Sequence, residues 1–360
     1  MEPFISQVKQ IYQMLEDEES KFIYLNRLNY LISGDTKYMD KIVETYLPEL
    51  PVWKGEDQFL AELPPDRPLV LFGAGSTGRR VLPIFQKDRR LIGFCSSTKA
   101  KQAEGFLGYP VMSPEELISR KDLTVVVTAV DANKEILNIL RESGYPEELV
   151  FVWGGSTAVD HEQYFGPEFI EYEPEEVFVD DGCCNLRSCL ALREHCAHIK
   201  KVYAFEPDPE NYQVCLRNME RYGFSEVELL PFGTWSEQAT LHFSMGLGGV
   251  SHVNEEGETS IPVKPIDDVV DPTERVTFLK MDIEGSELES LKGARQMIQR
   301  DKPKLAICIY HKPEDMTEIP LYIKSLVPEY KFYIRHHSNR YGETVLYAVL
   351  PKHNQHDNSL

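Results

Sequence analysis

The sequence predicts an α/β protein built from two doubly wound parallel sheets, and three observations predict it. Short apolar runs alternate with helical segments, as at residues 123–128 (LTVVVT), and continuous β-branched runs are typical of buried parallel strands. This alternation occurs twice, over residues 66–153 and again from residue 177 to residue 350. A chain of 360 residues is also too long for one ordinary core and suits two domains.

Charge and cysteine usage exclude several partners. The formal net charge is −20, whereas nucleic-acid backbones and anionic membrane surfaces need clustered Lys and Arg. No run of 18 apolar residues is present, so we expect neither nucleic-acid binding nor membrane insertion. The seven cysteines form no CxxC pair, and the N-terminus lacks a basic segment followed by an apolar run. These features predict buried, reduced thiols, no zinc, and a cytoplasmic protein.

The first 65 residues predict a helical cap. Apolar side chains repeat at helical spacing in the first segment, from Phe4 to Leu15. Turn residues follow at 33–35 and 48–51, and the segment ends at Pro64-Pro65. The strands of the first sheet begin directly after it.

A glycine-rich loop follows the first strand of residues 66–153, which we interpret as a small Rossmann-like domain. Gly73, Gly75 and Gly78 have GxGxxG spacing between a strand and a helix, where backbone N–H groups can bind phosphates. A dinucleotide site also needs an acid at the end of the next strand, and residues 94–97 read FCSS. The ligand of this loop stays open between a nucleotide or sugar nucleotide, NAD, and none.

An acidic and aromatic stretch separates the two α/β patterns. Residues 154–176 predict a linker, and residues 177–351 predict the second domain. Residues 352–360 are polar and predict a flexible tail.

Two strands of the second domain end in carboxylates. The first runs into Asp180-Asp181-Gly182 and the next into Glu206, and ligands of doubly wound sheets bind beyond such strand ends. Glu206 can accept hydrogen bonds from both hydroxyls of a ribose, and Gly182 permits close approach of backbone to ligand. Because Leu186 stands where a pyrophosphate loop needs glycine, a nucleoside without phosphates fits better, and S-adenosylmethionine is one. The predicted cofactor-binding set is Asp180, Asp181, Gly182, Asn185, Glu206, Pro207, Phe232, Gly233 and Asp282.

Two later strands end in groups that can take up protons. The strand at 276–281 ends in Asp282-Ile283-Glu284-Gly285, and the strand at 305–310 ends at His311. These strands are expected to be neighbours, so the acids and His311 converge on one cleft. The last two strands, at 330–335 and 344–350, are close enough to form an antiparallel hairpin. A mostly parallel sheet with this edge is typical of a methyltransferase rather than a dehydrogenase.

Residues 177–350 resemble the FkbM family of methyltransferases. The likeness is carried by residues 178–182 (FVDDG), 204–207 (AFEP), 278–287 (FLKMDIEGSE) and 292–294 (KGA). The resemblance implies a class I methyltransferase sheet and S-adenosylmethionine-dependent O-methylation of a hydroxyl on a sugar or another small metabolite. Cys183 and Leu186 stand where the family usually has Ala and Gly.

Methyl transfer to a hydroxyl requires the acceptor to be held in line and to lose a proton. We predict Asp282 or His311 as the base, with Glu284 beside them as a third catalytic group. The alternative is that these three groups hold Mg²⁺ against a diol, since hard cations prefer oxygen ligands. No dedicated metal site is predicted.

Two other classes of function remain open. One is a non-catalytic nucleotide-binding, sugar-binding or scaffold protein, suggested by Cys183 and Leu186. The other is an NAD-dependent sugar-modifying enzyme that uses the first glycine loop. The acceptor is expected to be a small molecule such as a sugar or sugar nucleotide, but its identity is not determined by the sequence. A homo-oligomer is left open.

Overall fold

The computed structural model describes residues 2–48, 50, 55–87, 90–129, 133–153, 163–245, 251–253 and 259–351. The chain forms two compact units, the larger comprising residues 1–47, 158–246 and 250–360 and the smaller comprising 48–157 with 247–249. Each contains a parallel sheet, so the predicted α/β class is confirmed. The predicted tail at 352–360 and the first part of the linker, 154–162, lie outside the described residues.

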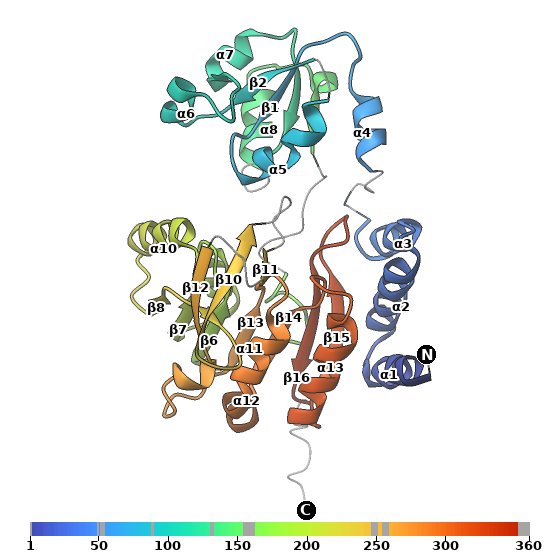
Figure 1. Cartoon of the computed structure of the whole chain (residues 1–360), viewed down its shortest axis with the longest axis vertical. Coiled ribbons are helices and arrows are strands. Elements are labelled where there is room, and N and C mark those ends of the chain that lie inside the picture. Colours follow the sequence, from blue (N-terminus) through green and yellow to red (C-terminus); the bar gives the residue numbers. More distant parts are fainter. Residues whose placement is uncertain are drawn as a thin grey trace, which may run out of the picture. The chain divides into compact units, whose positions relative to one another are not determined.

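The larger unit contains a seven-stranded sheet in the order β15-β16-β14-β13-β6-β7-β8 (Figure 1). The five strands from β14 to β8 are parallel, and β16 pairs antiparallel with both β14 and β15. The predicted terminal hairpin is therefore confirmed at the sheet edge. The strands are β6 (Glu176–Asp181), β7 (Ile199–Phe205), β8 (Val227–Leu230), β13 (Phe278–Met281), β14 (Lys304–Cys308), β15 (Lys331–His336) and β16 (Thr344–Val349).

Helices cover both faces of this sheet, because alternate strand residues point to opposite sides. Val177 and Val179 of β6 belong to a core shared with the helices α1–α3 and α11–α13, whereas Phe178 belongs to a core with α9 and α10. The helices are α1 (Glu2–Met14), α2 (Glu18–Ser33), α3 (Lys37–Tyr46), α9 (Arg187–His195), α10 (Pro209–Tyr222), α11 (Glu287–Gly293), α12 (Arg295–Asp301) and α13 (Asp315–Leu326).

A small second sheet is inserted between β8 and β13 in the chain. Its order is β11-β10-β12-β9, with β12 parallel to β9 and antiparallel to β10. Its strands are β9 (Gly233–Thr234), β10 (Ala239–Met245), β11 (Ser251–Val253) and β12 (Thr259–Lys264). A 3₁₀ turn at Ile266–Asp268 leads back toward β13.

The smaller unit contains five parallel strands in the order β3-β2-β1-β4-β5. The strands are β1 (Leu69–Phe72), β2 (Leu91–Cys95), β3 (Val111–Met112), β4 (Thr124–Val127) and β5 (Val150–Val152). The helices are α4 (Glu56–Glu62), α5 (Ser76–Phe85), α6 (Lys99–Glu104), α7 (Pro114–Ser119) and α8 (Asn133–Glu142), and a 3₁₀ turn spans Glu147–Leu149.

The predicted helical cap at 1–65 divides between the units. Helices α1–α3 pack on the larger sheet, where Leu15 bridges to Phe332 of β15. Phe59 of α4 instead packs edge-on against Phe85 and Trp153 of the smaller unit. An amphipathic pattern shows that a helix has a buried face, but it does not show which sheet covers that face.

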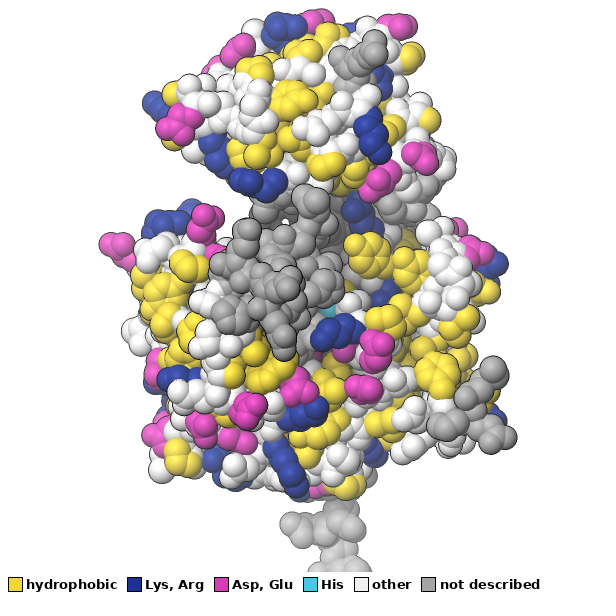
Figure 2. Space-filling model, viewed as in Figure 1, with side chains coloured by type: hydrophobic (Ala, Val, Ile, Leu, Met, Phe, Trp, Pro, Cys, Tyr) yellow, Lys and Arg dark blue, Asp and Glu magenta, His cyan; other side chains and the backbone are white. Residues whose placement is uncertain are grey.

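Acidic and basic side chains are interspersed over the visible face of the larger unit (Figure 2). Among the described residues, no helix combines the length and the apolarity needed to cross a bilayer.

Candidate functional site

The carboxyl ends of β6, β7 and β13 meet at one edge of the large sheet. Backbone bonds continue the ladders past the strand ends, from Cys183 N to Phe205 O (3.1 Å) and from Asp282 N to Asp181 O (3.1 Å). Glu206 N likewise donates to Leu230 O of β8 (3.0 Å). The structure therefore brings the predicted residues from three separate segments to the same edge.

Gly182 forms the turn directly after β6. Its φ is +80°, and a Cβ placed there would lie 2.1 Å from the Asp282 carbonyl oxygen and 2.9 Å from Ile283 Cγ2. The missing side chain thus allows the β6 turn to pack against the turn that carries Asp282. The close approach that requires glycine here is to the protein's own backbone.

Glu206 lies at the end of β7 and is 5% exposed. One of its carboxylate oxygens accepts a hydrogen bond from Asp208 N (2.9 Å). Burial raises the pKa of Glu206 to about 7, against the lowering effect of the hydrogen bond from Asp208 N. Hydrogen bonds from the two hydroxyls of a ribose would stabilise the charged form of Glu206, so this carboxylate is suited to bind a diol.

Pro207, Phe232 and Gly233 border Glu206. The Phe232 ring packs edge-on against Phe205 with centroids 5.8 Å apart. A Cβ on Gly233 would lie 3.7 Å from Pro207 Cγ. The structure therefore gathers these three predicted residues at the ends of β7 and β8.

Asp180 and Asp181 are held by protein groups on opposite faces of β6. Asp180 is fully buried, pairs with Lys280 Nζ (3.2 Å) and accepts a hydrogen bond from Ser188. Asp181 accepts hydrogen bonds from the hydroxyls of Thr234 (2.6 Å) and Ser290 (2.7 Å). Internal bonding thus holds both carboxylates in place, and the cofactor contact predicted for them stays a prediction.

Asn185 and Leu186 directly precede α9. The Asn185 side-chain oxygen accepts from Arg187 N (3.1 Å), and its carbonyl accepts from Asn218 of α10 (2.9 Å). Leu186 adopts φ +63°, a left-handed conformation that favours glycine, yet its side chain is fully buried. Cys183 is also buried, with its sulfur 3.8 Å from that of Cys215.

Asp282 follows β13 and is surrounded by donors. Tyr164 OH donates to Oδ2 (2.9 Å) and Tyr310 OH donates to Oδ1 (3.2 Å). Burial acts to raise the pKa of Asp282, but the charges of Lys280 and His311 and the Tyr164 hydrogen bond lower it below its ordinary value. The side chain is 25% exposed, so an ionised carboxylate is accessible here.

His311 lies among three acids beyond β14. Its Nδ1 is 2.8 Å from Glu287 Oε1, and its Nε2 is 3.4 Å from Asp282 Oδ1 and 3.6 Å from Glu284 Oε2. Burial alone would lower the pKa of His311, but the contact with Glu287 and the charges of Asp282 and Glu284 raise it to about 9. At neutral pH His311 is therefore a cation that holds these turns together.

The three residues that could hold Mg²⁺ differ by one from the predicted set of Asp282, Glu284 and His311. Ligand atoms of Asp282, Glu287 and His311 lie within 4.8 Å of one another. Glu287 takes the place expected of Glu284, whose side chain is 55% exposed. Protonated His311 balances part of the negative charge of these acids, and its ring nitrogens carry protons where a metal ligand needs a free lone pair.

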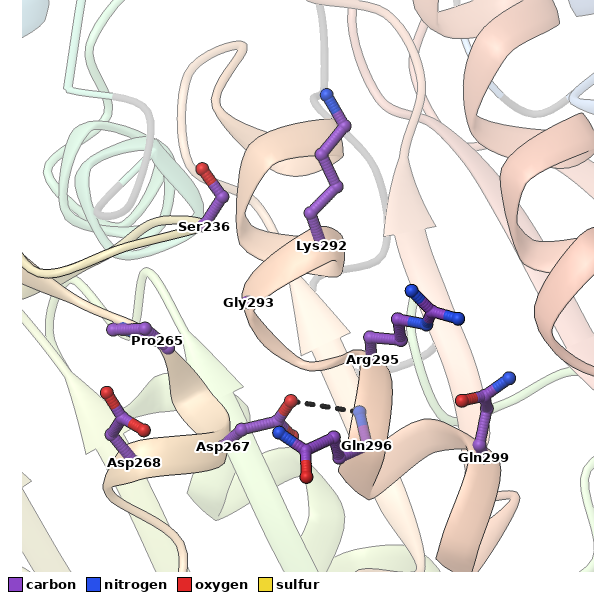
Figure 3. A pocket seen from close by; sticks show the side chains of 9 residues that line it. All are labelled: Ser236, Pro265, Asp267, Asp268, Lys292, Gly293, Arg295, Gln296 and Gln299. Carbon is purple, nitrogen blue, oxygen red and sulfur yellow. Dashed lines mark hydrogen bonds between the residues drawn. The ribbon is translucent and has the colours of Figure 1, made fainter.

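A surface hollow lies elsewhere, around the start of α12 (Figure 3). Asp267 accepts hydrogen bonds there from Gln296 N (2.9 Å) and Met297 N (2.8 Å), which caps the helix. The predicted site residues do not line this hollow. Its lining is Ser236, Pro265, Asp267, Asp268, Lys292, Gly293, Arg295, Gln296 and Gln299.

The glycine loop of the smaller unit is explained largely by packing. A Cβ on Gly78 would lie 2.1 Å from Gly73 O, and one on Gly73 (φ +137°) would lie 2.7 Å from Ala129 N. Around Gly75, by contrast, the space within 4 Å is open. Two of the three glycines therefore permit the strand and helix to approach each other, and a ligand for this loop stays a prediction.

Sequence reasoning missed Lys280, Tyr164 and Glu287. Lys280 lies beside Asp180 in the β13–β6 register and donates to Gly182 O (2.7 Å), so it fixes the first turn. A lone lysine in an apolar strand was the signal for this buried pair. Tyr164 and Glu287 carried no comparable signal, because Tyr164 lies in the linker and Glu287 resembles an ordinary first-turn acid.

The strand order, the antiparallel hairpin and the acids at the strand ends together define a class I methyltransferase fold. Residues 179–341 match the profile of the methyltransferase FkbM domain. The chain is thus similar to FkbM methyltransferase domains over these residues, which make up less than half of its length.

Several known proteins are similar to this chain. The hexuronic acid methyltransferase AglP of Haloferax volcanii is 28% identical over 158 residues, covering 41% of this chain and 63% of that protein. The FkbM methyltransferase of Methylobacillus flagellatus KT has a TM-score of 0.46 at 21% identity, covering 86% of this chain and 97% of that one. An rRNA methylase of Streptococcus thermophilus has a TM-score of 0.34 at 18% identity, and the match covers 50% of this chain and 89% of that one.

Proposed function

We propose that this protein is an S-adenosylmethionine-dependent O-methyltransferase that methylates a hydroxyl group of a sugar or a related small metabolite. The observation that carries the proposal is the position of Asp282. This accessible, ionised carboxylate lies in the turn that packs against Gly182, at the same sheet edge as Glu206. The FkbM domain match and the sugar-acid substrate in the name of the Haloferax relative support it.

The residues at this edge fit the proposed cofactor. Glu206 is a largely desolvated carboxylate with raised pKa, which suits two ribose hydroxyls as donors. Gly233 and Pro207 lie next to each other after the strands β8 and β7, and Phe232 adds an aromatic ring beside them. We assign cofactor binding to Glu206, Pro207, Phe232 and Gly233, while Gly182 and Asn185 order the loop after β6.

The bound cofactor supplies a methyl group on a sulfonium, and the protein positions the acceptor oxygen in line with it. Asp282 is the group that can accept the hydroxyl proton, because its lowered pKa keeps it ionised. Tyr164 and Tyr310 hold its two oxygens, so its orientation is set before the acceptor binds. Proton removal thus falls to Asp282.

His311 has a different role in this proposal from the predicted one. A pKa of about 9 leaves it protonated at neutral pH, so it cannot serve as the base. Its ion pair with Glu287 instead joins the ends of β14 and α11 and keeps the Asp282 turn in place. Glu284, at the exposed tip of that turn, could contact the acceptor.

Two measurements test the proposal. Calorimetry with S-adenosylhomocysteine tests the cofactor, and Glu206→Gln is expected to weaken its binding about tenfold or more by loss of a charged acceptor. Methyl transfer to a panel of sugars tests the reaction. Asp282→Asn should lower turnover roughly 100-fold or more with unchanged cofactor affinity, whereas Asp271→Asn, at an exposed turn, should match the wild type. No cofactor binding, or full turnover by Asp282→Asn, would contradict the proposal.

A further inference from the structure

Arg27 of α2 is a buried cation without an acidic partner among the described residues. It is 1% exposed, and its guanidinium donates to the Tyr341 carbonyl oxygen and contacts Met39 Sδ at 3.6 Å. Its Nε has no hydrogen-bond partner in the described structure. Arg335 of β15, by contrast, pairs with Asp17 (2.6 Å) and Glu19 (3.4 Å).

Such burial is unfavourable for a charged group. Burial lowers the pKa of Arg27 to about 10, although the group still carries its charge at neutral pH. A guanidinium has five N–H donors in a planar fork that matches carboxylate and phosphate oxygens. A carbonyl and a thioether satisfy few of these donors, so the arginine lacks the anion that would balance it.

The position of Arg27 relates it to the proposed acceptor site. Its partner Tyr341 is followed by Gly342, where a Cβ would lie 3.6 Å from Cε2 of Tyr310. The hydroxyl of Tyr310 donates to Asp282 (3.2 Å). The β15–β16 turn also lies at the carboxyl edge, because Ile309 N, just beyond β14, bonds to Thr344 O (3.0 Å). One tyrosine therefore separates the hairpin tip beside Arg27 from the proposed base.

We propose that Arg27 binds an anionic group, a carboxylate or a phosphate, on the acceptor whose hydroxyl faces Asp282. This inference rests on the proposed function and narrows the substrate to an acidic or phosphorylated sugar. The anion replaces the Tyr341 carbonyl as the acceptor of the guanidinium hydrogen bonds, since charged acceptors bind arginine more strongly than neutral ones. The Tyr341 side chain is 61% exposed, so its own packing does not fix the carbonyl that the anion replaces.

Histidines near Arg27 do not compete for the anion. Burial lowers the pKa of both His336 and His337, and the charge of Arg27 lowers that of His336 further. Both rings are therefore neutral at pH 7. They accept or donate within the hairpin instead, His336 Nδ1 with Thr344 Oγ1 (2.8 Å) and His337 Nε2 with Tyr347 OH (2.8 Å).

The test measures binding of D-glucuronate, D-glucose 6-phosphate and neutral D-glucose to the full-length protein saturated with S-adenosylhomocysteine. We expect one of the charged sugars to bind about tenfold more tightly than glucose. A preference for glucuronate assigns a carboxylate, and one for the phosphate ester assigns a phosphate. In Arg27→Met the preference should disappear, and an apolar replacement for a buried charge should keep the fold.

Two further variants separate recognition from structure. Arg335→Met removes a partnered arginine from the same region, so it should keep the charge preference even if it is less stable. Arg27→Lys keeps the charge without the planar fork and should retain a reduced preference, which covers the case that Arg27→Met does not fold. Equal binding of all sugars, a response to inorganic phosphate alone, or an unchanged preference in Arg27→Met would overturn the inference. Absence of S-adenosylhomocysteine binding would instead count against the proposed function, because the sugar series can be repeated without it.

Discussion

Gly182→Ala should damage both stability and activity. A non-glycine residue in the left-handed region costs roughly 1–2 kcal/mol. The new Cβ would also lie 2.1 Å from the Asp282 carbonyl oxygen, which is backbone and cannot rotate away. Overpacking of this kind costs typically about 1–3 kcal/mol. The free energy of unfolding should therefore fall by about 2–5 kcal/mol, a large part of the roughly 5–15 kcal/mol of an ordinary domain.

The clash also predicts a loss of function in molecules that still fold. Relief of the contact moves the Asp282 turn by roughly 1 Å, and a displacement of that size can cost about 100-fold in rate. Urea unfolding followed by circular dichroism measures the stability, and methyl transfer measured well below the unfolding midpoint measures the activity.

Gly223→Ala is the matched control. Gly223 ends α10 with φ +63°, but the space within 4 Å of a Cβ placed there is open. This variant should lose only the roughly 1–2 kcal/mol of left-handed strain and should keep its activity. Equal stability losses in the two variants, with activity kept in both, would refute the argument that Gly182 serves close packing.

Three further outcomes are expected. The pKa of His311 is raised from 6.5 to about 9, so its ion pairs contribute stability that is fully present below pH 6.5 and is lost as the pH rises through 9. The urea midpoint should therefore fall between pH 6.5 and 9 in the wild type but not in His311→Gln. Leu186→Gly should be destabilising despite the positive φ, because a cavity costs about 2–5 kcal/mol and the strain relieved is roughly 1–2 kcal/mol; a higher melting temperature would disprove this. Chelation with EDTA should leave methyl transfer unchanged, since His311, one of the three residues that could hold a metal, is protonated at neutral pH. Loss of activity restored by Mg²⁺ or Mn²⁺ would show the opposite.

Much of the site could be predicted because parallel strands place their carboxyl ends at one edge. Periodicity located β6, β7, β13 and β14, and the residues following each strand were therefore bound to converge. This rule alone was enough to predict that Gly182, Glu206 and Asp282 lie at the same sheet edge. The hairpin followed from the short connection between β15 and β16.

The roles of individual side chains could not be predicted in the same way. Asp181 and Asp282 look alike in the sequence, yet one is bonded to two buried hydroxyls and the other is accessible. His311 has the residue type and position of a base, but Glu287 lies 2.8 Å from its ring and keeps it protonated. A proton affinity depends on every charge within several ångströms, and those charges come from distant parts of the chain.

The sequence by itself determined the α/β class, the sheet edge that carries the site and the kind of cofactor proposed for it, because these follow from local periodicity and from residues next to strand ends. Only the tertiary structure decided that helices α1–α3 cover the large sheet, and that Arg27 lies beside a turn more than 300 positions later. Burial of an unpaired charge is a property of the assembled core, and no local pattern records it.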